Sequence, residues 1–155
     1  MADIYLLLKW LHIASAAVAF GSNATHMFWI VAANADPMHR ANILRLVKKI
    51  DDRLAVPSYA IMVACGIGMW LWQWPLNSSW IIVSLVLTGI LTVMGISFGP
   101  FMKRWIQLAG SVADGSAEDG GRLAAMSQRL SWWWAGIVLT VPFILYFMVV
   151  KPMLW

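Results

Sequence analysis

Two histidines in the first apolar stretch are the residues of this chain best suited to chemistry. His12 and His26 lie 14 positions apart within LHIASAAVAFGSNATHMF, residues 11–28, which contains no acidic residue. At 100° per residue this spacing falls about 40° short of whole turns, so the rings share one helix face, roughly 21 Å apart along the axis. Imidazole is the commonest metal ligand and binds haem iron when neutral. The pair therefore predicts metal ligation by His12 and His26, with a haem b at one or both.

Small and polar side chains lie between the two histidines on the same face, at Ser15, Ala16, Ala19 and Asn23. Such residues leave room for a flat cofactor, so we expect Ser15, Ala19 and Asn23 to contact the haem. The same residues would also suit plain helix packing in lipid. Each histidine could instead hydrogen-bond a hydroxyl or a backbone carbonyl of a neighbouring helix.

The second axial ligand of such a haem is not evident from the sequence. The third histidine, His39, lies in a connector and not in an apolar stretch. The remaining choices are a methionine, an open coordination position, or a histidine from a second copy or another subunit. The methionines inside apolar stretches are Met62, Met69, Met94 and Met102.

The elements that must position these residues are membrane-spanning helices. The chain of 155 residues is 61% hydrophobic and only 12% charged, whereas soluble domains are about 25% charged. Apolar runs of about 18 or more residues indicate spans, and four occur at about 4–33, 56–74, 80–102 and 131–150. The first lacks a basic leader and a cleavage pattern, so we interpret it as a retained helix. We predict an all-α, integral membrane four-helix bundle that forms a single domain over residues 1–155.

The distribution of charge predicts the orientation of the bundle. Nine of the eleven basic residues lie in the connectors 34–55 and 103–130, whereas the connector 74–79 is uncharged. The positive-inside rule places both basic connectors in the cytoplasm and both termini outside, in a bacterial inner membrane. Anionic lipid headgroups account for the net charge of +4, so no nucleic-acid partner is needed.

The two basic connectors are predicted to be amphipathic and largely helical. In the first, the apolar positions are Ile43, Leu46, Val47, Ile50 and Leu54, and the charged ones are Arg45, Lys48, Lys49, Asp51 and Asp52. This helix would lie at the headgroup level or extend the second span into the cytoplasm, with a bend at Pro57. In the second connector, GSVADGSAEDGG, residues 110–121, predicts a flexible turn before a further helix.

The two ends of the chain resemble a known family. YLLLKWLHIASAAVAFGS, residues 5–22, and FMVVKP, residues 147–152, resemble small bacterial integral membrane proteins grouped as domain of unknown function 2269. That family typically begins Leu-Leu-Lys-x-Leu-His and closes on Val-x-Lys-Pro. Lys9, His12, Lys151 and Pro152 match these motifs. The family is distantly similar to the four-helix membrane protoporphyrinogen oxidase and to CopD-type copper-resistance membrane proteins.

The two distantly similar groups differ in how many of their functional residues this chain matches. The oxidase is associated with haem b and has a histidine in the Leu-His of its first helix, which His12 matches. Its catalytic lysine in a later helix has no counterpart within the later spans here, which argues against oxidase activity. Met69 and Met153 do not form the methionine cluster that copper transport would require.

Three functions follow from the sequence. The first is a haem b-binding, cytochrome-like subunit for electron transfer. The alternative is a non-catalytic accessory or assembly subunit of a larger membrane complex, and the third is a small transporter. The chain would act as a homo-oligomer or with other membrane subunits. No carboxylate pair or nucleophile–base pair falls at one depth, so hydrolysis has no support, and the sequence leaves open whether the chain is an enzyme.

Overall fold

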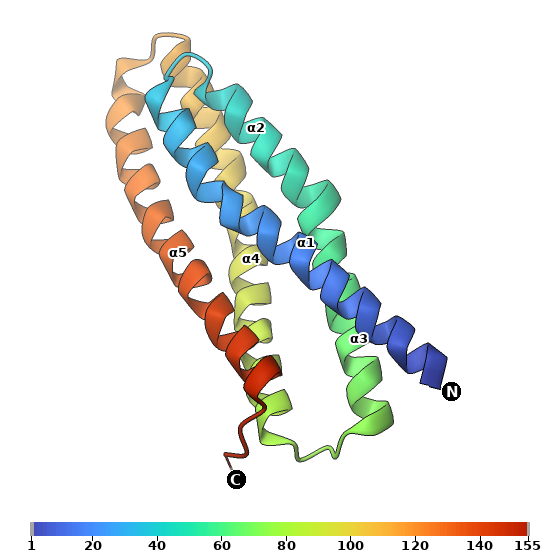
Figure 1. Cartoon of the computed structure of the whole chain (residues 1–155). Coiled ribbons are helices and arrows are strands. Elements are labelled where there is room, and N and C mark those ends of the chain that lie inside the picture. The colour runs from blue at the N-terminus through green and yellow to red at the C-terminus, as the bar shows by residue number, and fades with distance from the viewer. Residues whose placement is uncertain (1, 155) are drawn as a thin grey trace.

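Helices make up almost the whole chain. The computed structural model describes residues 2–154, and it contains no strand within that range. The helices are α1 (Ala2–Ala35), α2 (Arg40–Ile50), α3 (Val56–Gln73), α4 (Ser79–Ala113) and α5 (Ala117–Val150), and a π-helical turn, η1 (Asp51–Ala55), joins α2 to α3 (Figure 1). This confirms the predicted all-α fold class.

Four helical rods are long and apolar enough to cross a membrane. They are Asp3–Ala35, Arg40–Gln73, Ser79–Ala113 and Glu118–Val150, the second being the continuous run of α2, η1 and α3. The 35 residues of α4 extend roughly 50 Å at 1.5 Å per residue, which exceeds a hydrocarbon core of about 30 Å. The rods therefore project beyond the bilayer.

The bundle has two chemically different ends. The α1–α2 and α4–α5 turns lie together at one end, and the α3–α4 turn lies at the other with both termini (Figure 1). We call the first the connector end, because it carries the two basic connectors, and the second the terminal end. The structure thus brings together the two connectors whose charge predicted a common side.

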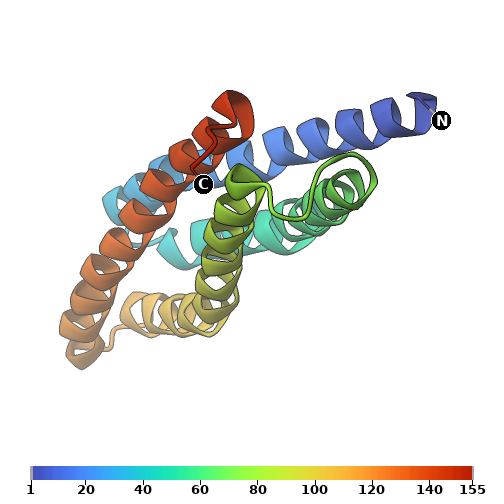
Figure 2. The ribbon, with the colours of Figure 1, turned by 90° about the horizontal axis from the view of Figure 1, so that it is seen from below.

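The helices are arranged as two pairs. α1 packs along α3, and α4 packs along α5, while α2 contacts both α1 and α4. The pairs meet near the connector end and diverge towards the terminal end (Figures 1 and 2). Leu44, Met102 and Trp105, each at most 2% exposed, belong to the core that fills the meeting point. Away from this core, the divergence leaves space between the pairs.

The face by which α2 packs differs from the predicted one. Ala41, Leu44 and Val47 are its buried residues, at the i, i+3, i+6 spacing of one helix face. Leu46 and Leu54, which were expected on the apolar face, are each 48% exposed. Of the two predicted placements, α2 takes the one that extends the second span, because its buried face packs between α1 and α4.

The π-helical turn lies just before Pro57 in the sequence. Proline has no N–H, and in a regular α-helix its ring would clash with the carbonyl four residues earlier, that of Arg53. In η1 the N–H of Val56 donates instead to the carbonyl of Asp51, five residues earlier. The wider turn accommodates the proline within one continuous rod, and such turns occur frequently at functional sites.

The α4–α5 turn is shorter than predicted. Only residues 114–116 lie outside helix, whereas a flexible turn was expected over 110–121. Gly115, with φ of +100°, supplies the left-handed backbone that the tight turn needs. The Ser111 hydroxyl donates to Oδ2 of Asp119 at 2.6 Å and ties the start of α5 to the end of α4. These contacts hold Gly120 and Gly121 in helix despite their low helix propensity.

Asp36 organises the α1–α2 turn. Its Oδ1 accepts the backbone N–H of His39 at 3.1 Å, and its Oδ2 lies 2.8 Å from Nδ1 of the same histidine. The side-chain hydrogen bond, followed by the backbone one, holds the pKa of the Asp36 carboxyl below its ordinary value. The stabilisation is therefore present above that ordinary value and is lost as the pH falls through the lowered one.

Candidate functional site

Two cavities lie between the helix pairs. One, of about 570 Å³, is lined by α1, α3, α4 and α5 near the terminal end, and we call it the terminal cavity. The other, of about 640 Å³, is lined mainly by α3 and α4, with η1 at its edge, and we call it the connector cavity. Val63 and Ile67 of α3 line both. Both volumes fall within the roughly 300–1,000 Å³ of small-molecule sites.

His12 lines the terminal cavity in a fixed orientation. Its Nδ1 donates to the backbone carbonyl of Met62 in α3 at 2.7 Å. That hydrogen bond selects the tautomer with the proton on Nδ1, which leaves the lone pair on Nε2. Nε2 has no hydrogen-bond partner among residues 2–154. A carbonyl behind Nδ1 is the arrangement that orients metal-ligating histidines.

Gly66 makes this position of His12 possible. A Cβ at Gly66 would lie 2.9 Å from Cε1 of the His12 ring, closer than real Cβ atoms come, and 3.2 Å from Nδ1, a tight contact. Any larger residue would therefore force the imidazole or α3 to shift. The role of Gly66 depends on which helix faces His12, so it could not be predicted from the sequence.

The terminal cavity has apolar walls and a cationic rim. Its lining includes the small residues Ala16, Ala17 and Gly66, the thioethers Met62, Met69 and Met148, and the ammonium groups of Lys9 and Lys151. The Nζ of Lys151 lies 4.6 Å from the ring centre of Trp74 and 5.3 Å from that of Trp80, which stabilises the cation. The chain just beyond is held to α4, because Oγ of Ser79 accepts the N–H of Leu154 at 3.0 Å.

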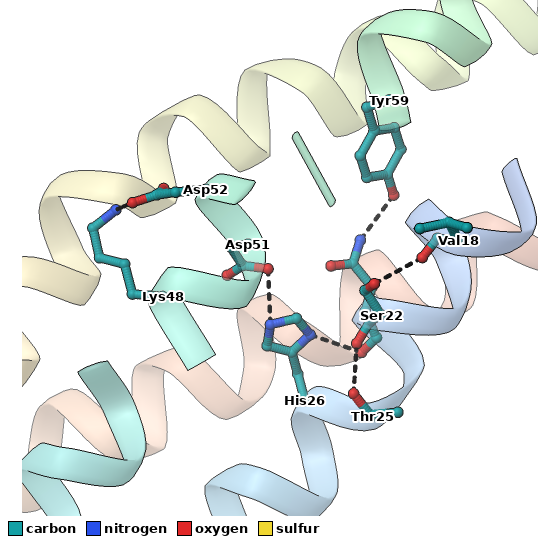
Figure 3. A network of polar contacts seen from close by, with 9 residues as sticks. Val18, Ser22, Thr25, His26, Lys48, Asp51, Asp52 and Tyr59 are labelled. Atoms are coloured by element: carbon teal, nitrogen blue, oxygen red, sulfur yellow. Dashed lines mark hydrogen bonds and ion pairs between the residues drawn. The ribbon is translucent and has the colours of Figure 1, made fainter. Parts of the chain in front are cut away.

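His26 makes a different set of contacts, drawn in Figure 3. Its Nε2 lies 2.9 Å from Oδ1 of Asp51 in η1, and its Nδ1 lies 3.2 Å from the backbone carbonyl of Asn23. The ring also stacks on Trp134 of α5, with centres 4.6 Å apart and planes 18° apart. His26 is only 2% exposed, so three elements enclose it. In this arrangement neither nitrogen is available to a metal.

The ring of His26 lies between two oxygen atoms, one near each nitrogen. A neutral imidazole has one N–H donor and one acceptor nitrogen, so it can donate to only one of them. The shorter contact is the one to Asp51, at 2.9 Å, and it joins α1 to η1.

The polar contacts continue from His26 into the connector cavity. Nδ2 of Asn23 donates to the hydroxyl of Tyr59 at 2.8 Å (Figure 3). Asp51, Asn23, Tyr59 and Trp134 all line the connector cavity. The indole N–H of Trp134 is buried and has no hydrogen-bond partner among residues 2–154. An unpaired buried donor costs about 1–3 kcal/mol in the free energy of folding.

The structure separates the residues that the sequence grouped into one haem site. His12 lines the terminal cavity, Asn23 lines the connector cavity, and Ser15 and Ala19 are buried and line neither. The Ser15 hydroxyl donates to carbonyls of its own helix, at Leu11 and His12. Within residues 2–154, no three His, Cys, Asp or Glu side chains gather into a metal-binding group.

Four residues of the two sites were not predicted as site residues: Gly66, Asp51, Tyr59 and Trp134. Asp51 lies seven residues after Leu44 and four after Val47, on the continuation of the buried face of α2, a signal that can be recognised only once that face is known. Its carboxylate placed it with the exposed charges in the prediction. Tyr59 and Trp134 had no such signal, since their positions depend on how α3 and α5 meet α1.

Helix lengths, apolar faces and the collected basic turns define a multi-pass helical membrane protein. Within that class, the chain belongs to the family described as Predicted integral membrane protein (DUF2269), which matches residues 6–152. This confirms the resemblance seen at the two ends of the sequence. No curated protein and no solved structure matches the chain.

Proposed function

We propose that this membrane protein binds haem b in the terminal cavity through Nε2 of His12 and takes part in electron transfer. The observation that carries the proposal is the state of His12, whose Nδ1 is held by the Met62 carbonyl while Nε2 is left unpaired beside a cavity of about 570 Å³. An unpaired imidazole within a membrane span is costly unless it has a functional partner.

The residues of the terminal cavity fit a haem. Ala16 and Ala17 would leave room for the flat macrocycle, and Lys9 and Lys151 would pair with its propionates. The thioether of Met62, Met69 or Met148 could serve as a further iron ligand. When bound, haem iron supplies one-electron exchange between its ferric and ferrous states.

The protein residues would hold and tune this group. The hydrogen bond from His12 to the Met62 carbonyl makes Nε2 a stronger electron donor to iron and fixes the plane of the ring. The aliphatic walls keep water away. Because both nitrogens of His26 are engaged, each chain would bind one haem, at His12, and not two.

We further propose that the protein resides in a bacterial inner membrane with the connector end in the cytoplasm, following the positive-inside rule. The terminal cavity would then open towards the outer leaflet. Helices fill nearly all of residues 2–154, so electrons would be exchanged with other membrane components, among them a second copy or a neighbouring subunit.

Absorption spectroscopy tests the haem proposal. The protein purified in mild detergent from haem-replete cells should show haem b bands and a positive pyridine haemochrome assay. His12→Ala should lose the bands, whereas the control His39→Ala should keep them, because His39 is 63% exposed in a connector. A colourless wild-type protein, or unchanged bands in a monodisperse His12→Ala variant, would overturn the proposal.

A further inference from the structure

The connector cavity contains polar groups that helix packing does not require. A buried histidine–carboxylate pair in a membrane protein adds little net stability, because the cost of desolvating both groups offsets their attraction. His26 lies in the first apolar span, where an ionisable group usually marks a functional site, and its partner Asp51 lies in the basic connector. Asp51 lines a cavity of about 640 Å³ whose wall is mostly apolar and also includes the Lys48–Asp52 ion pair.

The free hydrogen-bonding groups at this edge form a donor–acceptor set. The Tyr59 hydroxyl accepts a hydrogen bond from Asn23, and its own hydrogen has no acceptor within the described part of the chain. Oδ1 of Asp51 contacts His26, and Oδ2 has no partner there. A ligand hydroxyl could therefore accept from Tyr59 and donate to Asp51.

The rest of the cavity suits an apolar ring with a hydrocarbon tail. Phe98, Leu91, Ile137 and Met102 contribute to its wall, with Gly95 and Gly99 of α4. α3 and α4 belong to different helix pairs and diverge towards the terminal end (Figures 1 and 2). Ile67 and Ile96, which line the cavity on these two helices, are 38% and 73% exposed. In a bilayer these residues face lipid, so a ligand could enter sideways from the membrane.

We propose that the connector cavity binds a lipid-soluble hydroquinone, with one ring hydroxyl between Tyr59 and Asp51 and the tail directed between α3 and α4. The hydroquinone makes both hydrogen bonds, whereas the oxidised quinone, having no hydroxyl, can only accept from Tyr59. The reduced form therefore binds more tightly.

Other occupants fit the same groups less well. A lipid acyl chain would use the apolar wall but leave the Tyr59 and Asp51 groups unpaired. A small anion would meet the Asp51 carboxyl and the Lys48 ammonium, which is already paired with Asp52 at 2.6 Å. This inference does not rest on haem in the terminal cavity, because it uses different residues and a different cavity.

Calorimetric titration of the full-length protein in phospholipid nanodiscs tests the proposal. The probes are a decyl-chain ubiquinol, its oxidised quinone, and decylbenzene, which has the same chain but no hydroxyl. We expect the ubiquinol to bind several-fold more tightly than the quinone. Tyr59→Phe should weaken ubiquinol binding roughly tenfold, and Asp51→Asn roughly 10- to 100-fold, as expected for losing a neutral and a charged hydrogen bond.

Matched controls separate a site effect from a general one. Tyr146→Phe and Asp114→Asn remove the same groups from exposed positions that line neither cavity, and they should bind ubiquinol like the wild type. His12→Ala, which removes the proposed haem ligand, should also bind ubiquinol normally. Colourless protein that binds ubiquinol would overturn the haem proposal alone.

Three results would overturn the hydroquinone proposal. One is decylbenzene binding as tightly as ubiquinol, which would indicate an acyl-chain site. Another is ubiquinol binding that is lost in His12→Ala but kept in Tyr59→Phe, which would place the ligand in the terminal cavity. The third is equal affinity of the wild type for the reduced and oxidised forms, a measurement that needs no variant to fold.

Discussion

At the scale of single residues, the two histidines of α1 differ in what surrounds their nitrogens. His12 has one nitrogen held by a carbonyl and the other free, whereas His26 has an oxygen at each. The first arrangement leaves a lone pair beside a cavity, and the second encloses the ring. Their identical residue type and shared helix face gave no sign of this difference.

Gly66→Ala tests how closely α3 supports His12. The added methyl group would lie 2.9 Å from Cε1 of the imidazole, so the ring must shift, and we expect its hydrogen bond to the Met62 carbonyl to weaken. We expect a loss of about 1–3 kcal/mol in the free energy of unfolding, as for overpacked sites. Unfolding in mixed detergent micelles measures it, and haem bands, where present in the wild type, should shift or disappear.

Gly68→Ala is the matched control for this substitution. Its methyl group would meet only Leu8 Cδ1 at 3.9 Å, an ordinary contact. Alanine favours helix over glycine by up to about 1 kcal/mol, so this variant should be as stable as the wild type or more so. Equal effects of the two substitutions would mean that His12 is not seated on Gly66.

Part of the candidate site could be predicted from the sequence. His12 was identified because an imidazole in an apolar span must face the interior, and it lines a cavity as that argument requires. The partners of His26 could not be identified. Trp134 lies more than 100 positions away in the chain, and the contact of Asp51 depends on the π-helical turn, which has no reliable sequence pattern.

At the scale of the elements, α2 determines how the two helix pairs meet. Its buried face, Ala41, Leu44 and Val47, packs between α1 and α4, and the same face continues to Asp51. The helix that closes the core therefore also delivers the carboxylate to His26. The length and helicity of this connector could be predicted, but its buried face could not, because Leu44 and Leu46 have the same hydrophobicity and only packing distinguishes them.

Leu44→Ala and Leu46→Ala test the face by which α2 packs. Leu44 is fully buried, so its truncation should cost about 2–5 kcal/mol in the free energy of unfolding. Leu46 is 48% exposed, and its truncation should change stability by about 0.5 kcal/mol or less. Both are measured by unfolding in mixed micelles. A larger effect at Leu46 would show that α2 packs by the face first predicted.

At the scale of the whole molecule, charge and shape are distributed along the same axis. The connector end has the basic turns and the dense core, and the terminal end has the separated helices and the terminal cavity. The collection of basic residues at one end could be predicted from the order of spans and connectors. The separation of the helix pairs could not, since it follows from where α2 inserts.

Cysteine labelling tests the orientation of this axis. In a Cys65→Ala background, Asn77→Cys lies in the α3–α4 turn and Asp114→Cys in the α4–α5 turn, both at exposed positions. In intact cells, a membrane-impermeant maleimide should label Asn77→Cys alone, because the basic connectors stay in the cytoplasm. Asp114→Cys should react only after lysis. The reverse pattern would invert the proposed topology.

Val63 and Ile67 line both cavities from one face of α3. In a close-packed interior, a side chain that gives way to a guest on one side takes room from the other side. These two side chains therefore form a wall that the two cavities share and that can shift towards either one. A ligand in one cavity changes the shape of the other, so the two sites can be coupled without a hinge or a second subunit.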